Sequence, residues 1–176
     1  LPLAYQRQAE GEGEAPRGAM AHLTLGDSQG VVYEGIYSPS FGRDVLSGIA
    51  GRRRQTGSHG HLHANASRNL AHWWRKGEAE STPRLLESEQ SNTSILYNEH
   101  FIFKLYRRCQ TGVHPDLEIV RYLSEDAGFP FVPAYAGSLE YRRGEEAPLV
   151  LGLMQTFVPN QGDAWGHFVD LAKRYF

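Results

Sequence analysis

The residues best suited to carry out chemistry surround one lysine in the second half of the chain. Lys104 lies in the strand-forming run of residues 101–106, and Glu118 follows it in a segment with helix-start signals. The polar residues just before that run are Ser91, Asn92, Thr93 and Ser94. Amides and hydroxyls of such a loop can hold phosphate oxygens, and a lysine oriented by a helix acid can pair with them. The pattern is compatible with nucleotide binding, although a surface lysine whose stem covers a strand has the same spacing.

Alternation predicts the strand that positions this lysine. One face of residues 101–106 carries Phe101, Phe103 and Leu105, and the other carries Ile102, Lys104 and Tyr106. Residues 95–97 form a second strand, and the turn at residues 98–100 makes the two a hairpin. A further strand is expected over residues 84–90, which makes residues 91–94 a loop between strands.

A helix is expected over residues 115–126. Pro115 suits its first turn, acids beside the positive end of the helix dipole suit its start, and Gly128 and Pro130 suit its end. At 100° per residue Glu118 projects on the polar side of this helix, and Asp116 points towards the apolar side. Glu118 is the preferred partner of Lys104, Asp116 is the alternative, and complementation of the dipole alone would explain both acids.

The other expected elements follow from the same periodicities. They are a hairpin of residues 22–26 and 30–37, a helix over 41–54 with Ser40 as N-cap, and strands over 61–66, 132–141 and 147–158. Residues 71–76 are given no element of their own. Residues 165–176 predict an amphipathic helix without a stop signal, so we expect the chain to be part of a longer protein.

Four blocks of sequence in a fixed order resemble the bacterial maltokinases, including the maltokinase regions fused to trehalose synthase. The blocks are SNTS at 91–94, FKLYRR at 103–108, HPDLE at 114–118 and FVPNQGDAW at 157–165. The resemblance is dense from Glu89 to Trp165 and looser before it. It implies an α+β fold similar to the N-terminal lobe of protein kinases and aminoglycoside phosphotransferases, in which an antiparallel sheet with a helix is preceded by a small α+β cap subdomain.

The resemblance also implies a division of the chain and a set of binding residues. Residues 1–80 correspond to the cap, 81–160 to the nucleotide-binding lobe, and 161–176 to the start of a linker helix to a second lobe. The residues matched to nucleotide-binding positions are Ser91, Asn92, Thr93, Ser94, Lys104, Glu118, Gln155, Phe157, Val158 and Asp163. Residues 91–94 correspond to the glycine-rich loop, residues 154–158 to the hinge strand, and Asp163 opens the linker helix.

The activity implied by the resemblance is that of a carbohydrate kinase, a phosphotransferase with an alcohol group as acceptor. With ATP and Mg²⁺ as cofactors, it would convert maltose to maltose 1-phosphate for α-glucan synthesis. No catalytic base and no metal ligand can be assigned in these residues, so the chain alone is expected to be inactive. The alternatives are a non-catalytic module that docks onto trehalose synthase and a small-molecule kinase with another acceptor.

Two other motifs could be interpreted as a catalytic loop or a metal site, but the sequence does not favour either interpretation. His114, Pro115 and Asp116 look like a kinase catalytic loop, but that loop requires an asparagine five residues after its aspartate, where this chain has Arg121. A strand through His59, His61 and His63 would place three imidazoles on one face, which could bind zinc. A polar strand face is the preferred interpretation, because no cysteine or acidic fourth ligand is near.

Composition limits the remaining classes. The chain has 176 residues, of which 40% are hydrophobic, and this length suits one domain or two small ones. Its formal net charge of −2 differs from the strongly basic charge that is typical of nucleic-acid-binding domains. No apolar run reaches the roughly 18 to 20 residues of a membrane-spanning helix, and we see no signal peptide. The single cysteine, Cys109, suits a reducing cytoplasm. We therefore expect a cytoplasmic protein with no nucleic-acid or membrane partner.

Overall fold

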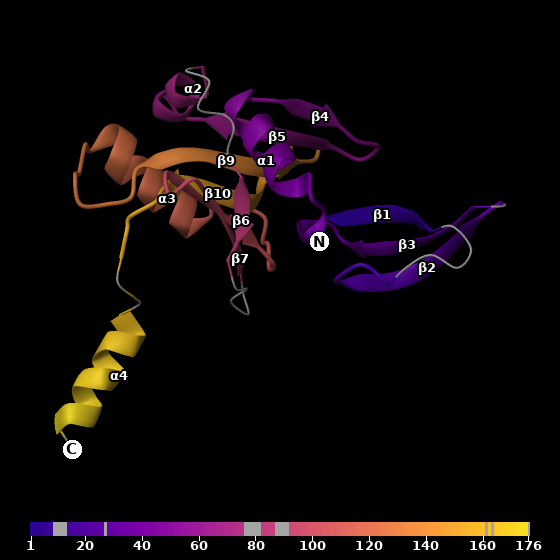
Figure 1. Ribbon diagram of the computed structural model, residues 1–176. Helices are drawn as coiled ribbons and strands as arrows, with labels where there is room; N and C mark the ends of the chain where they lie inside the picture. Colours follow the sequence, from indigo (N-terminus) through magenta and orange to yellow (C-terminus); the bar gives the residue numbers. More distant parts are fainter. Residues whose placement is uncertain are drawn as a thin grey trace.

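The computed structural model describes residues 1–8, 14–26, 28–75, 82–86, 92–160, 162 and 164–175. Within these residues the protein is an α+β structure with two antiparallel sheets and few helices (Figure 1). The α+β class with antiparallel strands that the sequence predicts is confirmed.

The smaller sheet has three strands, and the last of them in sequence is central. The strands are β1 (Leu3–Gln8), β2 (Ala19–Leu25) and β3 (Ser28–Glu34), in the order β1-β3-β2. β2 and β3 pair as the predicted hairpin. A short 3-10 turn, η1 (Gly35–Tyr37), leads from β3 towards the rest of the molecule.

The larger sheet has seven strands in the order β4-β5-β9-β10-β8-β7-β6. They are β4 (Arg54–Thr56), β5 (His61–Ala66), β6 (Pro83–Leu85), β7 (Asn92–Tyr97), β8 (Phe101–Tyr106), β9 (Tyr135–Arg142) and β10 (Leu149–Thr156). β5, from the segment that the resemblance assigns to a cap, pairs along its whole length with β9. One sheet therefore contains strands from both segments of the expected division.

Four helices accompany the sheets in the described part of the chain. They are α1 (Phe41–Ala50), α2 (Arg68–Arg75), α3 (Pro115–Arg121) and α4 (Ala164–Tyr175). The π-helical turn η2 (Tyr122–Asp126) continues α3, and Gly128 follows with φ of 61°. The predicted helix over 115–126 is confirmed with its start at Pro115, and α4 lies apart from the sheets (Figure 1). Residues 71–75, which carried no predicted element, belong to α2.

The hairpin of β7 and β8 closes with a tight turn. The N–H of His100 donates to the Tyr97 carbonyl at 2.9 Å, and the two residues between them, Asn98 and Glu99, have φ of 45° and 55°. Two positive φ values are the signature of a type I′ turn, whose twist matches that of the strands. The turn sets Phe103 opposite Ile95, so that both side chains face α1.

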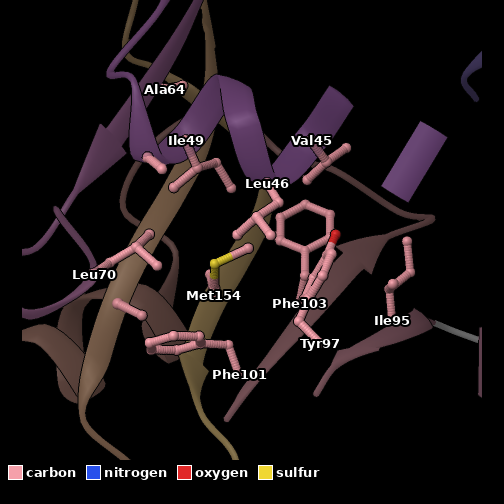
Figure 2. Close-up of a cluster of buried hydrophobic side chains, with 12 residues drawn as sticks. Val45, Leu46, Ile49, Ala64, Leu70, Ile95, Tyr97, Phe101, Phe103 and Met154 are labelled. Atoms are coloured by element: carbon pink, nitrogen blue, oxygen red, sulfur yellow. The ribbon is translucent and has the colours of Figure 1, made fainter. Parts of the chain in front are cut away.

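The main core lies between α1 and the larger sheet. Figure 2 shows Leu46 and Ile49 of α1 directed at Phe103 and Met154, and each of these four side chains is at most 2% exposed. Full burial of a large apolar side chain contributes about 1.5 to 3 kcal/mol. Gly137 of β9 permits the close approach of α1, because a Cβ there would overlap the Ile49 side chain.

A second, smaller core lies on the opposite face of the larger sheet. Its buried residues are Tyr106, Tyr135, Val150 and Leu153, and Leu117 and Val120 of α3 pack against them. α1 and α3 therefore cover opposite faces of the same sheet.

Candidate nucleotide-binding surface

Lys104 lies on the face of the larger sheet that α3 covers. Phe101 and Phe103 of β8 belong to the α1 core and Tyr106 to the α3 core, which places Lys104 with Tyr106 by strand alternation. The predicted division of this strand into two faces is confirmed. The lysine is half-buried.

A row of directly opposed residues crosses this face of the sheet. Lys104 pairs with Ser94 of β7 on one side and with Leu153 of β10 on the other. Leu153 pairs with Ser138 of β9, which pairs with Asn65 of β5. The row thus brings a hydroxyl and a lysine into direct opposition, followed by one buried leucine and further polar residues.

The polar residues expected in a loop before β7 are part of that strand. Asn92, Thr93 and Ser94 form the first half of β7. The pairing of β7 with β8 extends beyond the apolar residues 95–97, from which this strand was predicted. Thr93 is fully buried and its Oγ1 accepts a hydrogen bond from Arg107 Nε at 3.0 Å. Its side chain is on the α1 face, away from Lys104. Ser91 lies outside the described residues.

The first turn of α3 is held through Asp116. Its carboxylate accepts a hydrogen bond of 3.2 Å from the Tyr106 hydroxyl, and His114 stacks on the Tyr106 ring at 4.1 Å. Burial and the neighbouring Asp116 carboxylate raise the pKa of Tyr106 well above its ordinary value. The prediction that Asp116 points towards the apolar side of the helix is confirmed.

Lys104 takes part in none of the ion pairs among the described residues. Glu118 is exposed on α3, and Asp116 is engaged by Tyr106 two positions along the same strand face. The pairing of Lys104 with Glu118 therefore stays a prediction. Within the described residues, the Lys104 ammonium is therefore not engaged by a carboxylate.

The residues matched to a hinge, 154–158, are the end of β10 and the two residues after it, next to β8. Gln155 pairs with Ile102, and the Phe157 N–H donates to the His100 carbonyl at 2.8 Å. The Val158 carbonyl accepts from the Asn160 side chain at 3.2 Å, and the Val158 side chain is exposed. The hydrogen bonds of these two residues within the described ranges involve neither the Val158 N–H nor the Phe157 carbonyl. Asp163 lies outside these ranges.

Tyr106 is a residue of this surface that sequence reasoning did not single out. Its place on the Lys104 face followed from the alternation of β8, and that alternation was the signal that could have found it. Its contact with Asp116 depends on how α3 packs on the sheet, which residue spacing does not contain.

Two of the three histidines in residues 59–63 lie in one strand on the outer part of the larger sheet. His59 precedes β5, whereas His61 and His63 are in it, 6.2 Å apart between ring centroids. The predicted strand over residues 61–66 is confirmed, and the less favoured arrangement with all three histidines on one strand face does not form, because His59 lies before the strand. Nowhere in the described ranges do three or more His, Cys, Asp or Glu side chains group to hold a metal ion.

The described residues form an α+β structure with antiparallel sheets, in which the partly buried Lys104 lies on the α3 side of the larger sheet. No family model matches the sequence. No helix in the described part of the chain has the length and apolar character needed to cross a membrane.

Proposed function

We propose that the chain is the N-terminal nucleotide-binding lobe of an ATP-dependent maltokinase. The complete enzyme transfers a phosphoryl group from ATP to maltose, which gives maltose 1-phosphate and ADP, and it requires Mg²⁺. The observation that carries the proposal is the position of Lys104, directly opposite Ser94 and on the face of the sheet that α3 covers.

The order of the strands supports this proposal. Five strands in the chain order β6, β7, β8, β9 and β10 lie in the spatial order β6-β7-β8-β10-β9, with α3 between β8 and β9 in the sequence. In protein kinases the nucleotide lysine is on the third strand, and the helix that follows carries its acidic partner. Lys104 is on the third strand of this set.

The residues of this face suit a nucleotide. Lys104 provides a cation that has no ion-pair partner among the described residues, and Ser94 provides a hydroxyl opposite it. The Val158 N–H and the Phe157 carbonyl, at the end of the neighbouring strand, provide one donor and one acceptor for an adenine edge. Charge, hydroxyl and main-chain groups are the components that phosphates and a base require.

The role of Lys104 is electrostatic. Bound MgATP supplies the phosphoryl group, and the lysine holds the α- and β-phosphates and offsets their charge. It moves no proton. The described residues contain no acidic cluster for Mg²⁺, so the proposal assigns the metal ligands and the base for the sugar hydroxyl to a second lobe.

Phosphorus NMR on the complete reading frame tests the proposal directly. The protein is incubated with MgATP and maltose, and parallel samples contain glucose or trehalose. A sugar 1-phosphate that forms only with maltose supports the maltokinase assignment, and a product with another sugar indicates a related kinase. Folded protein that yields no product with any of these sugars contradicts the assignment.

A pair of lysine variants tests the residue that carries the proposal. Lys104→Ala is expected to lower kcat by about 100-fold or more, because a charged group that acts on the transferred phosphate is lost. Lys173→Ala removes an exposed lysine of α4 and serves as the matched control. Thermal melting should be unchanged in both. Near-normal turnover of Lys104→Ala would refute the assignment of Lys104 as the lysine that binds the nucleotide phosphates.

One observation favours the docking function as a second candidate. The smaller sheet exposes Leu3, Tyr5 and Leu23 by 62%, 44% and 41%, and exposed apolar patches often mark interaction sites. We propose trehalose synthase as the partner of this surface. Copurification with trehalose synthase that persists in a Leu3→Ser, Tyr5→Ser, Leu23→Ser variant would refute this surface as the docking site.

A further inference from the structure

A large cavity lies on the α1 side of the larger sheet, opposite the Lys104 face. Its volume is about 790 Å³, within the roughly 300 to 1,000 Å³ of pockets that hold small molecules. It adjoins the main core, since Val45 and Ala64 of that core also line it. No residue of the candidate nucleotide-binding surface other than Tyr106 lines it.

The cavity floor is apolar and incompletely covered. Five leucines from four neighbouring strands converge on it, and each is only partly buried. They are Leu62, Leu105, Leu139, Leu149 and Leu151. Leu46 and Leu70, in the nearby core, are at most 2% exposed. A contiguous apolar floor under an open volume is typical of a ligand pocket.

One stripe of α1 forms the opposite wall. Phe41, Asp44, Val45 and Gly48 line the cavity, and their spacing of three and four residues places them on one side of the helix. A Cβ added to Gly48 would meet no atom within 4 Å. Glycine is unfavourable inside a helix, and at this position it leaves the cavity open.

The charges around the cavity indicate the sign of an occupant. Glu34 and Arg107 lie 3.0 Å apart and balance each other at one end. Asp44 is in the first turn of α1 and Arg53 follows its last turn, so the two ends of the helix dipole offset the two charges alike. Arg53 takes part in no ion pair with the described residues. Together with Gln55, which also lines the cavity, it offers the N–H donors that a carboxylate accepts.

We propose that this cavity binds a small amphipathic anion, a molecule with an elongated apolar body and a single acidic group. The leucine floor and the α1 stripe contact the apolar body, and the Arg53 guanidinium binds the acid. The inference does not depend on the proposed kinase function, because it concerns the opposite face of the sheet.

Isothermal titration calorimetry with two amphiphiles of equal chain length tests the sign of the charge. Decanoate is the anionic probe and decyltrimethylammonium the cationic one, both below their micellar concentrations. We expect one decanoate per protein and binding of the cationic probe at least about tenfold weaker. Equal affinity for the two probes would overturn the assignment of an anionic ligand.

Two matched pairs of variants test the place of binding. Gly48→Leu fills the cavity and should abolish decanoate binding, whereas Gly48→Ala leaves most of the volume and should retain it. Arg53→Gln should weaken binding about tenfold, since it removes a charged hydrogen-bond donor. Arg43→Gln removes an exposed arginine of α1 outside the lining and should change nothing. Unchanged binding to folded Gly48→Leu would show that decanoate binds elsewhere.

Cys109 provides a second readout in the unmodified protein. It is the single cysteine of the chain, it is half-buried, and it lines the cavity. Decanoate should slow the alkylation of Cys109 by iodoacetamide with the same concentration dependence as the calorimetric binding. Alkylation that stays equally fast at saturating decanoate would contradict occupancy of this cavity.

Discussion

Replacement of Arg107 by alanine should weaken the contact between the two sheets and lower the free energy of unfolding. Arg107 Nη2 lies 3.0 Å from Glu34 Oε1, which joins the end of β3 to the residue after β8. The contact lacks the alignment of a hydrogen bond at Glu34 Oε1, so its strength is electrostatic. Arg107 Nε also donates to buried Thr93. One side chain thus connects the smaller sheet to two strands of the larger one.

The exposure of the pair sets the expected magnitude. The side chains of Arg107 and Glu34 are 26% and 16% exposed. Loss of one partner from a fully buried pair costs about 3 to 5 kcal/mol, whereas an exposed pair contributes only about 0 to 1 kcal/mol. We expect Arg107→Ala to lower the free energy of unfolding by about 2 kcal/mol.

Urea unfolding followed by circular dichroism measures this loss. Arg108→Ala is the matched control, because Arg108 is the exposed neighbour and its loss should cost less than about 0.5 kcal/mol. A double-mutant cycle with Glu34→Gln should give a coupling of about 1 kcal/mol. If Arg107→Ala and Arg108→Ala lose equal stability, the reasoning about the two sheets is refuted.

Three further predictions concern single positions. Glu99→Gly should raise the free energy of unfolding by about 0.5 to 1 kcal/mol in urea unfolding, because Glu99 has φ of 55° and glycine adopts that conformation without strain; a loss of stability would contradict this. Gly137→Ala should lower it by about 2 kcal/mol, since the new Cβ would overlap Ile49 and the Asn65 carbonyl oxygen; a neutral result would mean that α1 shifts freely. Burial first and neighbouring arginines second lower the pKa of His63 below 6.5, so the unfolded state binds more protons there and stability should fall as the pH drops below 6.5. His63→Gln should flatten this fall in thermal melts between pH 5 and 7, relative to an exposed-histidine variant, His22→Gln, and equal slopes would argue against His63.

Local structure was predictable where a short stretch of sequence contains the whole cause. Alternation assigned the two faces of β8, Pro115 and Gly128 delimited the helical segment of α3 and η2, and the turn at residues 98–100 made a hairpin of its flanking strands. Each of these signals lies within the segment whose structure it predicts. Periodicity and backbone preference therefore suffice to predict them.

Tertiary pairing overrode the local signal at two places. Residues 92–94 are small and polar, which favours a loop, yet β8 provides hydrogen-bond partners that extend β7 through them. Residues 71–75 belong to α2, whose Leu70 is fully buried in the main core. Packing against distant elements decides such marginal segments, because their own propensities differ by little.

The amino-acid sequence by itself determined the strand with Lys104, the face on which the lysine lies and the acidic first turn of the helix that follows. Only the tertiary structure decided which acid meets which partner. Asp116 binds Tyr106, and Glu118 is exposed. It also decided that β5 extends the sheet beyond β9 and that a cavity opens beside α1. These features depend on contacts between residues far apart in the chain, whose geometry is set by the packing of whole elements and not by the order of neighbouring residues.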